Sequence, residues 1–386
     1  MISRSVPTYT YSDIWHSLKR RSQQGSDQDL QSRLAEMHQV RHVFLLDSAR
    51  VALYVLLKAY NRPGGVLMPA YTCIVVPEAV CYAGYTPVFV DIDYHSLNLT
   101  TSNVRQVLTR DITVLLATHL FGIPCELDEF SDILDPDRVL LVEDAAAALG
   151  AEYRSQPVGS FGNAAILSFQ ATKVVAGEVG GALLTNDDDL AAKVTRLLET
   201  AVPPANGWQL LAKSFVRKIV TSEWLYSLTQ FGYRTLRGEE MFEIVTPQNQ
   251  IPPRFLANNS PFSNTLITLQ MDRLNWNLNR RRKLAQIYQE LLAGHPRLTH
   301  CWIPQRCSPA WIQYPVFVED KKAFYKHMQR AGVDLSWTYR YSCADSYKKV
   351  GYPNAQKAAQ TVVGLPTYPS LSDQQARAIA RAATRY

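Results

Sequence analysis

The sequence lacks most of the features that mark metal-binding, disulfide-rich and membrane proteins. Its 386 residues include six cysteines, none in a CxxC pair and none near a histidine at the spacing of a metal site. A zinc site is therefore not expected, and at this chain length neither is a disulfide framework. No apolar stretch is long enough to span a membrane, and the N-terminus has no signal-peptide core. We expect no metal and a cytoplasmic location.

Motifs of several large enzyme classes are also missing. The chain has no GxGxxG after a strand, no Walker-type P-loop, no HExxH and no GxSxG. The net charge of +6 is a mild basic excess, and no nucleic-acid-binding motif accompanies it. We expect no nucleic-acid partner, although a slight positive charge suits an anionic substrate or cofactor.

What the sequence does contain is a regular alternation of short apolar runs and helical patterns. Several runs are apolar on both faces, which is typical of buried strands in a mostly parallel sheet. We therefore expect an α/β fold with a mostly parallel seven-stranded sheet flanked by helices. The seven runs are HVFLL (42–46), VLMPA (66–70), PVFVDI (87–92), TVLLAT (113–118), RVLLVED (138–144), AAILSF (164–169) and GALLTN (181–186).

The chain as a whole divides into three parts. Residues 1–40 predict an N-terminal helical arm, in which Ser12-Asp13 caps a helix from Ile14. Residues 41–255 predict the large domain. Residues 256–386 predict a linking helix from Asn264 to about 293 and a small C-terminal α/β domain, with strands at AWIQYPVFVE and VDLSW.

Within the large domain, residues 203–255 form an unusual stretch. Proline pairs flank an aromatic, basic and helix-like segment that carries Lys213, Arg217 and Lys218. One interpretation is a basic lid over a nucleotide diphosphate or against an anionic membrane surface. The favoured alternative is dimer or core packing, because apolar helical faces are generally buried.

Two residues at the ends of adjacent predicted strands indicate a cofactor. Asp144 ends the run 138–144, and Lys173 follows the run 164–169 in a segment poor in charge. A desolvated lysine is a nucleophilic amine, and a carboxylate can keep a pyridine nitrogen protonated. Pyridoxal phosphate chemistry requires both groups. A loop lysine and a strand-end acid are each common, so the prediction depends on the pair.

Neighbouring segments offer the rest of such a site. In LLDSARVAL (45–53) a strand turns directly into a helix, whose N-terminus, with Ser48 and Arg50, offers donors to a phosphate. Ser168 is a second phosphate-donor candidate. An ordinary N-cap is the alternative for Ser48.

The two alanines Ala146 and Ala147 belong to a run that leaves a flat floor for a planar ring. His119 ends a buried strand on the same edge as Asp144. It is a candidate for lining the substrate pocket, and a hydrogen-bonded structural role is the alternative.

Four blocks of the chain together resemble the DegT/DnrJ/EryC1/StrS family of sugar aminotransferases. They are PAYTCIVVPEAVCYAGYTPVFVDID (69–93), ATHLFGIPCELD (117–128), VEDAAAALGAEYRSQPVGSFGNAAILSFQATKVVAGEVGG (142–181) and GLPTYPSLSDQQ (364–375). The resemblance runs from about residue 42 to the end, apart from 203–255. It implies the fold type I of pyridoxal-phosphate-dependent transferases and a homodimer with its active sites at the subunit interface.

By this resemblance, Lys173 bonds covalently to the cofactor and Asp144 contacts its pyridine nitrogen. Ser48, Ala49 and Ser168 fall where the family binds the phosphate.

Some positions depart from the family pattern. Cys73 stands where an aromatic residue usually stacks on the ring, Ala147 where glutamine is usual, and Asp47 where the phosphate turn has glycine. Asn258 is the nearest match to a segment that the partner subunit contributes, and with His119 it is a candidate for substrate contact.

The resemblance implies transamination of a keto sugar, nucleotide-linked and serving polysaccharide biosynthesis, with glutamate as amino donor. Two alternatives remain open. A sugar dehydratase of the same family would lack the lysine, so Lys173 argues against it. A cofactor-free binding homologue would explain the changes at Asp47, Cys73 and Ala147.

Overall fold

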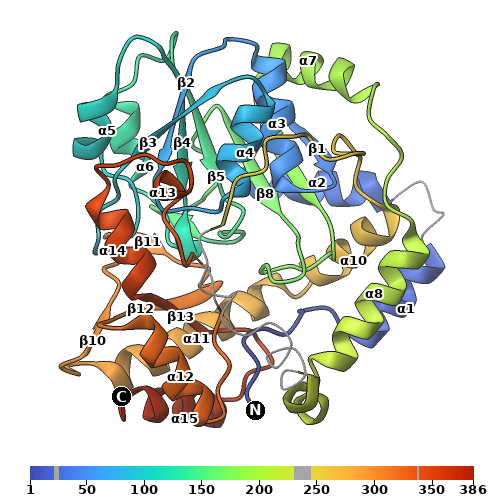
Figure 1. Ribbon diagram of the computed structural model, residues 1–386. Coiled ribbons are helices and arrows are strands. Elements are labelled where there is room, and N and C mark those ends of the chain that lie inside the picture. Colours follow the sequence, from blue (N-terminus) through green and yellow to red (C-terminus); the bar gives the residue numbers. More distant parts are fainter. Residues whose placement is uncertain (21–25, 230–244, 337–338) are drawn as a thin grey trace.

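The computed structural model describes residues 1–20, 26–229, 245–336 and 339–386. Its centre is a seven-stranded sheet in the order β1-β9-β8-β5-β4-β2-β3 (Figure 1). Neighbours from β8 to β3 are parallel, and β9 is antiparallel to β8 and β1. The strands are β1 (His42–Leu46), β2 (Gly65–Pro69), β3 (Thr86–Val90), β4 (Ile112–Thr118), β5 (Leu140–Asp144), β8 (Ala164–Ser168) and β9 (Gly181–Thr185). The expected mostly parallel sheet is confirmed.

Helices connect and cover these strands. They are α2 (Ser26–His38), α3 (Ala49–Tyr60), α4 (Val75–Tyr82), α5 (Thr101–Val107), α6 (Leu127–Ser131) and α7 (Asp188–Leu198), and a 3₁₀ turn η1 (Leu120–Gly122) follows β4. Helix α3 begins at a local signal, because the Ser48 side chain accepts a hydrogen bond from the Val51 amide at 3.3 Å. It ends at Asn61, whose φ of 50° is left-handed.

Helix α1 (Tyr11–Arg20) begins earlier than the expected start at Ile14. Thr10 and Asp13 exchange two hydrogen bonds, from the Thr10 amide to Asp13 Oδ2 and from the Asp13 amide to Thr10 Oγ1. Thr10 therefore caps the helix and Asp13 lies inside its first turn. The predicted cap at Ser12-Asp13 is wrong by one turn, because the reciprocal pair forms one turn upstream.

The predicted single helix over 264–293 is two helices, α10 (Pro261–Met271) and α11 (Leu274–Leu292). Arg273 leaves helical geometry at φ −117° and ψ 18°, and its guanidinium pairs with Asp13 of α1. Helix α8 (Gly207–Val220) lies in the stretch 203–255 and packs on α1 and α10. Residues 230–244 of that stretch are outside the described residues.

The C-terminal part forms a smaller unit at one end of the large sheet (Figure 1). Its sheet has the order β10-β12-β13, with β10 (Leu298–His300), β12 (Gln313–Val318) and β13 (Val362–Pro366). Its helices are α12 (Lys321–Arg330), α13 (Cys343–Ser346), α14 (Pro353–Thr361) and α15 (Asp373–Ala383). A third sheet joins β11 (Cys307–Ser308), β6 (Glu152–Tyr153) and β7 (Gln156–Pro157).

The segment VDLSW is not the expected strand in its described residues. Val333 and Ser336 each make one isolated bridge, to Ile2 and Gly364, and Trp337 is outside the described residues. The place beside β12 that a second strand would take belongs to β13. Hydrophobic alternation alone did not distinguish VDLSW, which makes only isolated bridges, from β13, which pairs with β12.

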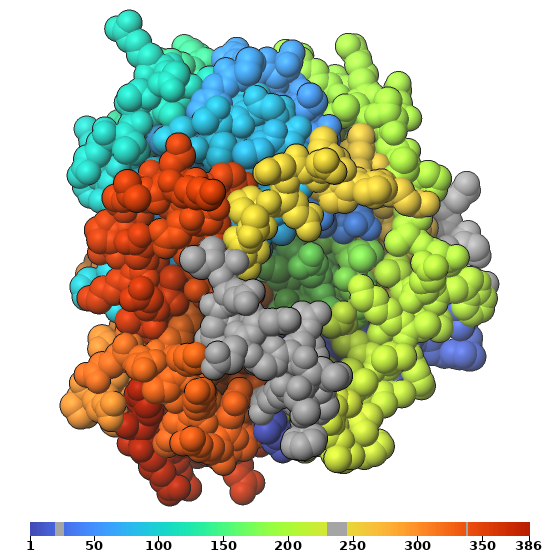
Figure 2. All heavy atoms as spheres, viewed as in Figure 1, coloured from blue at the N-terminus to red at the C-terminus, as the bar shows by residue number. Residues whose placement is uncertain are grey.

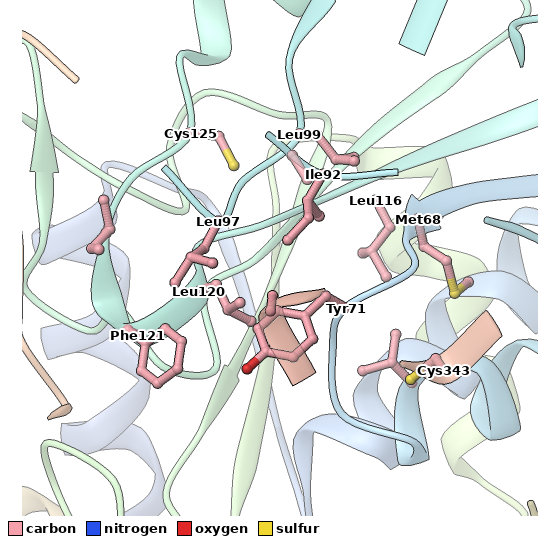
Figure 3. Packing of buried hydrophobic residues seen from close by; sticks show 14 of the residues in the cluster. Met68, Tyr71, Ile92, Leu97, Leu99, Leu116, Leu120, Phe121, Cys125 and Cys343 are labelled. Carbon is pink, nitrogen blue, oxygen red and sulfur yellow. The ribbon is translucent and has the colours of Figure 1, made fainter. Parts of the chain in front are cut away.

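One hydrophobic core joins the two units. Side chains of the large sheet, of η1 and of α13 pack together in it (Figure 3). Tyr71, which follows β2, has no solvent-exposed surface, and neither has Cys343 of α13. The C-terminal unit is therefore held firmly beside the carboxyl ends of the parallel strands. None of the helices in the described ranges is both long enough and apolar enough to cross a membrane.

Candidate active site

A cavity of about 320 Å³ opens at the carboxyl ends of the parallel strands. Asp144, the last residue of β5, and Lys173, in the loop after β8, both line it. We call it the Asp144 cavity. The face of the molecule is hollowed here, between the yellow segment that precedes α10 and the yellow-green α8, and green atoms from the middle of the chain form its floor (Figure 2). The two residues that the sequence singled out thus face one space.

Asp144 is 4% exposed and has few partners. Its Oδ1 accepts one hydrogen bond, from the Ala146 amide at 3.1 Å. Burial raises the pKa of Asp144, while the Ala146 amide and the charge of Lys173 oppose that rise. The described residues place no cation within ion-pair distance of this carboxylate. A protonated ring nitrogen would supply the missing positive charge.

Lys173 resembles Asp144 in this respect. Within the described residues its Nζ makes neither a hydrogen bond nor an ion pair. Burial lowers the pKa of Lys173, and the nearby Cys73 and Asp144 partly offset that effect. A lysine with a lowered pKa holds more of its amine in the neutral, nucleophilic form.

A narrow cradle lies between the start of α3 and the start of β9. Ser48 bridges to Gly180, and a Cβ added at Gly181 would lie 2.3 Å from the Ser48 carbonyl carbon. Ser48, Ala49 and Ser168 all line the cavity at this end. The Ser48 hydroxyl already caps Val51, whereas the Ser168 hydroxyl has no hydrogen-bond partner among the described residues. The cradle can therefore offer α3 amides and the Ser168 hydroxyl to a phosphate.

Two charged residues beside the cradle behave differently from the sequence expectation. Arg50 lines the cavity, but its guanidinium lies 3.5 Å from buried Glu78 and over the ring of Phe255. Asp47 also lines the cavity, and burial raises its pKa against the charges of Lys213 and Arg50. Burial therefore weakens the negative charge that Asp47 would direct at a phosphate.

Small side chains form the walls on which a flat ring could rest. Cys73, Ala146 and Ala147 line the cavity, and burial raises the pKa of the Cys73 thiol, so it stays neutral. Together with the carboxylate, the lysine and the cradle, these walls fit pyridoxal phosphate: an uncompensated acid for the ring nitrogen, an amine for the aldehyde and donors for the phosphate.

The sequence suggested His119 and Asn258 as substrate contacts. Neither lines the Asp144 cavity or the second cavity, which is described below. His119 is fully buried; its Nε2 bonds to Glu143 at 3.2 Å and its Nδ1 accepts from the Cys125 amide at 3.1 Å. This geometry supports the structural alternative for His119. Asn258 is exposed and bridges to Leu46. The expectation for Asn258 concerned the partner subunit's site, and it stays a prediction.

A second cavity, of about 460 Å³, adjoins the first at Ala147, Lys173 and Tyr339, which line both. We call it the arginine cavity, because Arg4, Arg217 and Arg281 line it. Sequence reasoning did not find Tyr339 or Arg281 as site residues. Tyr339 is distant in the chain and carried no signal.

For Arg281 a signal existed. The residue falls on the buried stripe of α11, spaced as Leu274, Leu278, Arg281, Ala285 and Tyr288. A charged residue at a core position of an amphipathic helix is unusual. That spacing alone could have marked Arg281 as a residue with a special role.

Helix α8 contributes two basic residues to these cavities. Lys213 lines the Asp144 cavity, and Arg217 lines the arginine cavity. Arg217 Nε bonds to both carboxylate oxygens of Glu178, at 2.8 and 3.0 Å, and Tyr9 also bonds to Glu178. Lys218 donates to the Pro7 carbonyl at 3.3 Å. Lys213, Arg217 and Lys218 therefore lie toward the cavities and the N-terminal arm.

A mostly parallel seven-stranded sheet, with a free lysine and an uncompensated carboxylate in one cavity at its edge, defines a fold type I enzyme that uses pyridoxal phosphate. The chain belongs to the DegT/DnrJ/EryC1/StrS aminotransferase family, whose model matches residues 19–235 and 247–384. The protein is a pyridoxal-phosphate-dependent aminotransferase. The match runs through residues 203–235, so the family covers most of the stretch expected to lie outside it.

Known relatives agree with this assignment. The chain is 26% identical to the spore coat polysaccharide biosynthesis protein SpsC of Bacillus subtilis, over 90% of this chain and 85% of that protein. It is 26% identical to dTDP-4-dehydro-2,3,6-trideoxy-D-glucose 4-aminotransferase of Saccharopolyspora spinosa, over 88% and 82%. The solved sugar aminotransferase CalS13 of Micromonospora echinospora superposes with a TM-score of 0.79 at 21% identity, covering 100% of both chains. This last likeness shows the fold.

Proposed function

We propose that the protein transfers an amino group from glutamate to a keto sugar carried on a nucleotide. The observation that carries the proposal is the shared cavity of Lys173 and Asp144, neither of which has a counter-charge at ion-pair distance within the described residues. The sugar is suggested by relatives named for dTDP-sugar amination and polysaccharide biosynthesis. Lys173 argues against the dehydratase alternative.

Each residue then has a defined task. Pyridoxal phosphate, when bound, supplies an aldehyde for covalent attachment and a ring that accepts electrons. Lys173 holds that attachment and, once released, takes the proton from the donor's α-carbon. Asp144 keeps a proton on the ring nitrogen. Ser168 and the first amides of α3, after Ser48, hold the phosphate.

We assign the sugar nucleotide to the arginine cavity. Arg4, Arg217 and Arg281 line this cavity, and it adjoins Lys173. Helix α8 supplies one wall through Arg217, as a lid would, and it also packs on α1 and α10, as the packing alternative for the stretch 203–255 requires. Two aromatic side chains of this stretch, Phe215 of α8 and Trp224 beyond its C-terminal end, are 47% and 75% exposed. A homodimer with its active sites at the interface, with Asn258 reaching the partner's site, stays a prediction, as does a cytoplasmic location.

The first experiment asks whether Lys173 carries the cofactor. Purified protein should be yellow, and borohydride should bleach the absorbance band and fix the cofactor covalently to a peptide that contains residue 173. Lys173→Ala should lose both the bleaching and turnover, by about 10³-fold or more. Lys193→Ala on the exposed side of α7 is the matched control. A colourless protein that takes up no pyridoxal phosphate would contradict the proposal.

The second experiment identifies the substrate. Protein loaded with pyridoxamine phosphate is mixed with a panel of keto-sugar nucleotides, and the return of the aldehyde form is followed by absorbance. Glutamate should produce the reverse change. A protein that exchanges amino groups only between amino acids and keto acids would remove the sugar from the proposal and leave the aminotransferase in place.

A further inference from the structure

Arg281 is the most deeply buried charged residue that lines the arginine cavity, at 2% exposure. It lies in the middle of α11 on the stripe that faces the core. A charge at such a position is costly unless a partner offsets it. The group that offsets the charge of Arg281 therefore has to be identified.

The partners of Arg281 in the described part of the chain are all neutral. Its Nε donates to Asn277 Oδ1 at 2.7 Å, and its Nη1 donates to the carbonyls of Trp311 and Ile312 at 3.3 and 3.4 Å. In the described part of the chain, no carboxylate pairs with it and Nη2 makes no hydrogen bond. Burial lowers the pKa of Arg281 to about 9, so the group is still charged at neutral pH.

The other two arginines of this cavity are compensated. Arg217 lies 2.8 Å from Glu178, and Arg4 lies 3.8 Å from Asp334. Arg281 differs from both because the described residues provide it with no anion. A cavity-lining guanidinium without an anion is prepared for an anionic ligand.

Arg281 is also fixed close to the lysine loop. The Asn277 side chain, which accepts from Arg281, donates through Nδ2 to the carbonyl of Val174 at 2.6 Å. Val174 directly follows Lys173. On the other side, the carbonyl of Trp311 that Arg281 contacts also accepts from Thr367 Oγ1 at 2.5 Å. The guanidinium is thus positioned before any ligand arrives, which lowers the entropy cost of binding.

We propose that Arg281 binds the α-carboxylate of the amino donor, an inference that rests on the proposed transamination. The planar guanidinium matches a carboxylate in shape and charge. In an α-amino acid, the carboxylate is bonded directly to the carbon that carries the amino group. This amino group is transferred beside Lys173, so the group that binds the carboxylate must lie beside the lysine loop. The diphosphate of a sugar nucleotide is separated from the reacting carbon by the sugar ring, and it fits this position less well.

The test measures binding of an unreactive dicarboxylate. The cofactor-bound protein is titrated with glutarate by calorimetry. Arg281→Met should weaken binding about 10- to 100-fold, as loss of a charged hydrogen bond predicts, and Arg281→Lys should weaken it less. Arg282→Met is the matched control. Arg282 also lies in α11 and also donates to backbone carbonyls, those of Pro309 and Gly150, but it lines neither cavity. It should leave glutarate affinity unchanged.

Three results would overturn the inference: equal glutarate affinity in wild type and Arg281→Met, an equal loss in Arg282→Met, or loss of binding of uridine diphosphate instead of glutarate. If Arg281→Met does not fold, wild-type protein still decides. It should bind glutarate well and the neutral isostere glutaramide about 10- to 100-fold more weakly; equal affinity would refute the carboxylate site. A wild-type protein without cofactor would refute the proposed function separately.

Kinetics identify which carboxylate is bound. In the donor half-reaction, wild type should prefer L-glutamate to its α-amide, L-isoglutamine, by about 10- to 100-fold in KM. Arg281→Met should remove that preference, with KM rising more than kcat falls. A purely structural role would lower activity on both donors alike. Retention of the preference in Arg281→Met would overturn the assignment to the α-carboxylate.

Discussion

Glu143 and Asp144 are neighbours at the end of β5, and their surroundings could hardly differ more. Glu143 is fully buried and accepts three backbone amides from the turn 159–162, at 2.6 to 2.7 Å, and a bond from His119. Asp144 points to the other side of the strand and accepts a single amide. One carboxylate is saturated by the protein, and the other is left with unused acceptor capacity at a cavity.

The same contrast appears in their protonation. Burial favours a raised pKa for both residues. In Glu143 the hydrogen bonds from His119 and the turn outweigh burial and hold the pKa below its usual value. In Asp144 burial prevails and the pKa is raised. A buried acid that the fold does not neutralise therefore marks a place where a ligand is expected, whereas a saturated one marks structure.

The largest effect is expected for Asp144→Asn. Asparagine keeps the shape but cannot hold a proton on a ring nitrogen, so turnover should fall about 10³-fold, or about 4 kcal/mol in activation free energy. Steady-state kinetics and the absorbance spectrum measure this. Asp188→Asn, at the exposed start of α7, should keep full activity. Comparable activity in Asp144→Asn and wild type would remove the distinction between the two carboxylates.

Glu143→Gln should show the opposite behaviour. An amide cannot accept all the bonds that the carboxylate receives, so the free energy of unfolding should fall by about 3 kcal/mol. Urea denaturation measures the loss, and turnover per folded molecule should stay near wild type. If activity fell sharply while stability remained, Glu143 would belong to the site and the comparison would fail.

Gly181→Ala should have a moderate effect at the cradle. Its Cβ would meet backbone atoms of Ser48 and Ala49 at 2.3 to 2.7 Å, and backbone cannot move aside cheaply. We expect a loss of about 2 kcal/mol in stability and weaker cofactor affinity, measured by thermal unfolding and cofactor titration. Gly207→Ala is the control, since its Cβ would meet Phe262 at an ordinary 3.5 Å. Unchanged cofactor affinity in Gly181→Ala would argue against a phosphate in the cradle.

The smallest effect concerns pH. Because the folded pKa of Asp144 is raised above its unfolded value, its contribution to stability is present at low pH and is lost as pH rises through the folded pKa. Cofactor-free wild type should therefore lose stability relative to Asp144→Asn as pH rises from about 4 to 7. Melting temperatures across this range test the sign, and a trend of opposite sign would mean that the acid is already compensated.

Much of the fold could be predicted because its signals are local. The apolar runs, the cap at Ser48, the position of Asp144 at a strand end and that of Lys173 in the loop after β8 are all encoded within a few residues. The break at Arg273 and the loss of a strand at VDLSW depend on distant partners, namely Asp13 and β13. Arg281 and Tyr339 reach the site through tertiary packing, and periodicity reports only that a position is buried.

The N-terminal arm has a practical consequence. Arg4, Ser5 and Val6 line the arginine cavity, Tyr9 holds Glu178, and the amino group of Met1 bonds to Ser227 at 2.9 Å. The N-terminal arm thus forms part of the wall of the arginine cavity. Fusions placed ahead of Met1 should disturb catalysis more than folding, and biochemical work on this protein calls for a tag that can be removed cleanly.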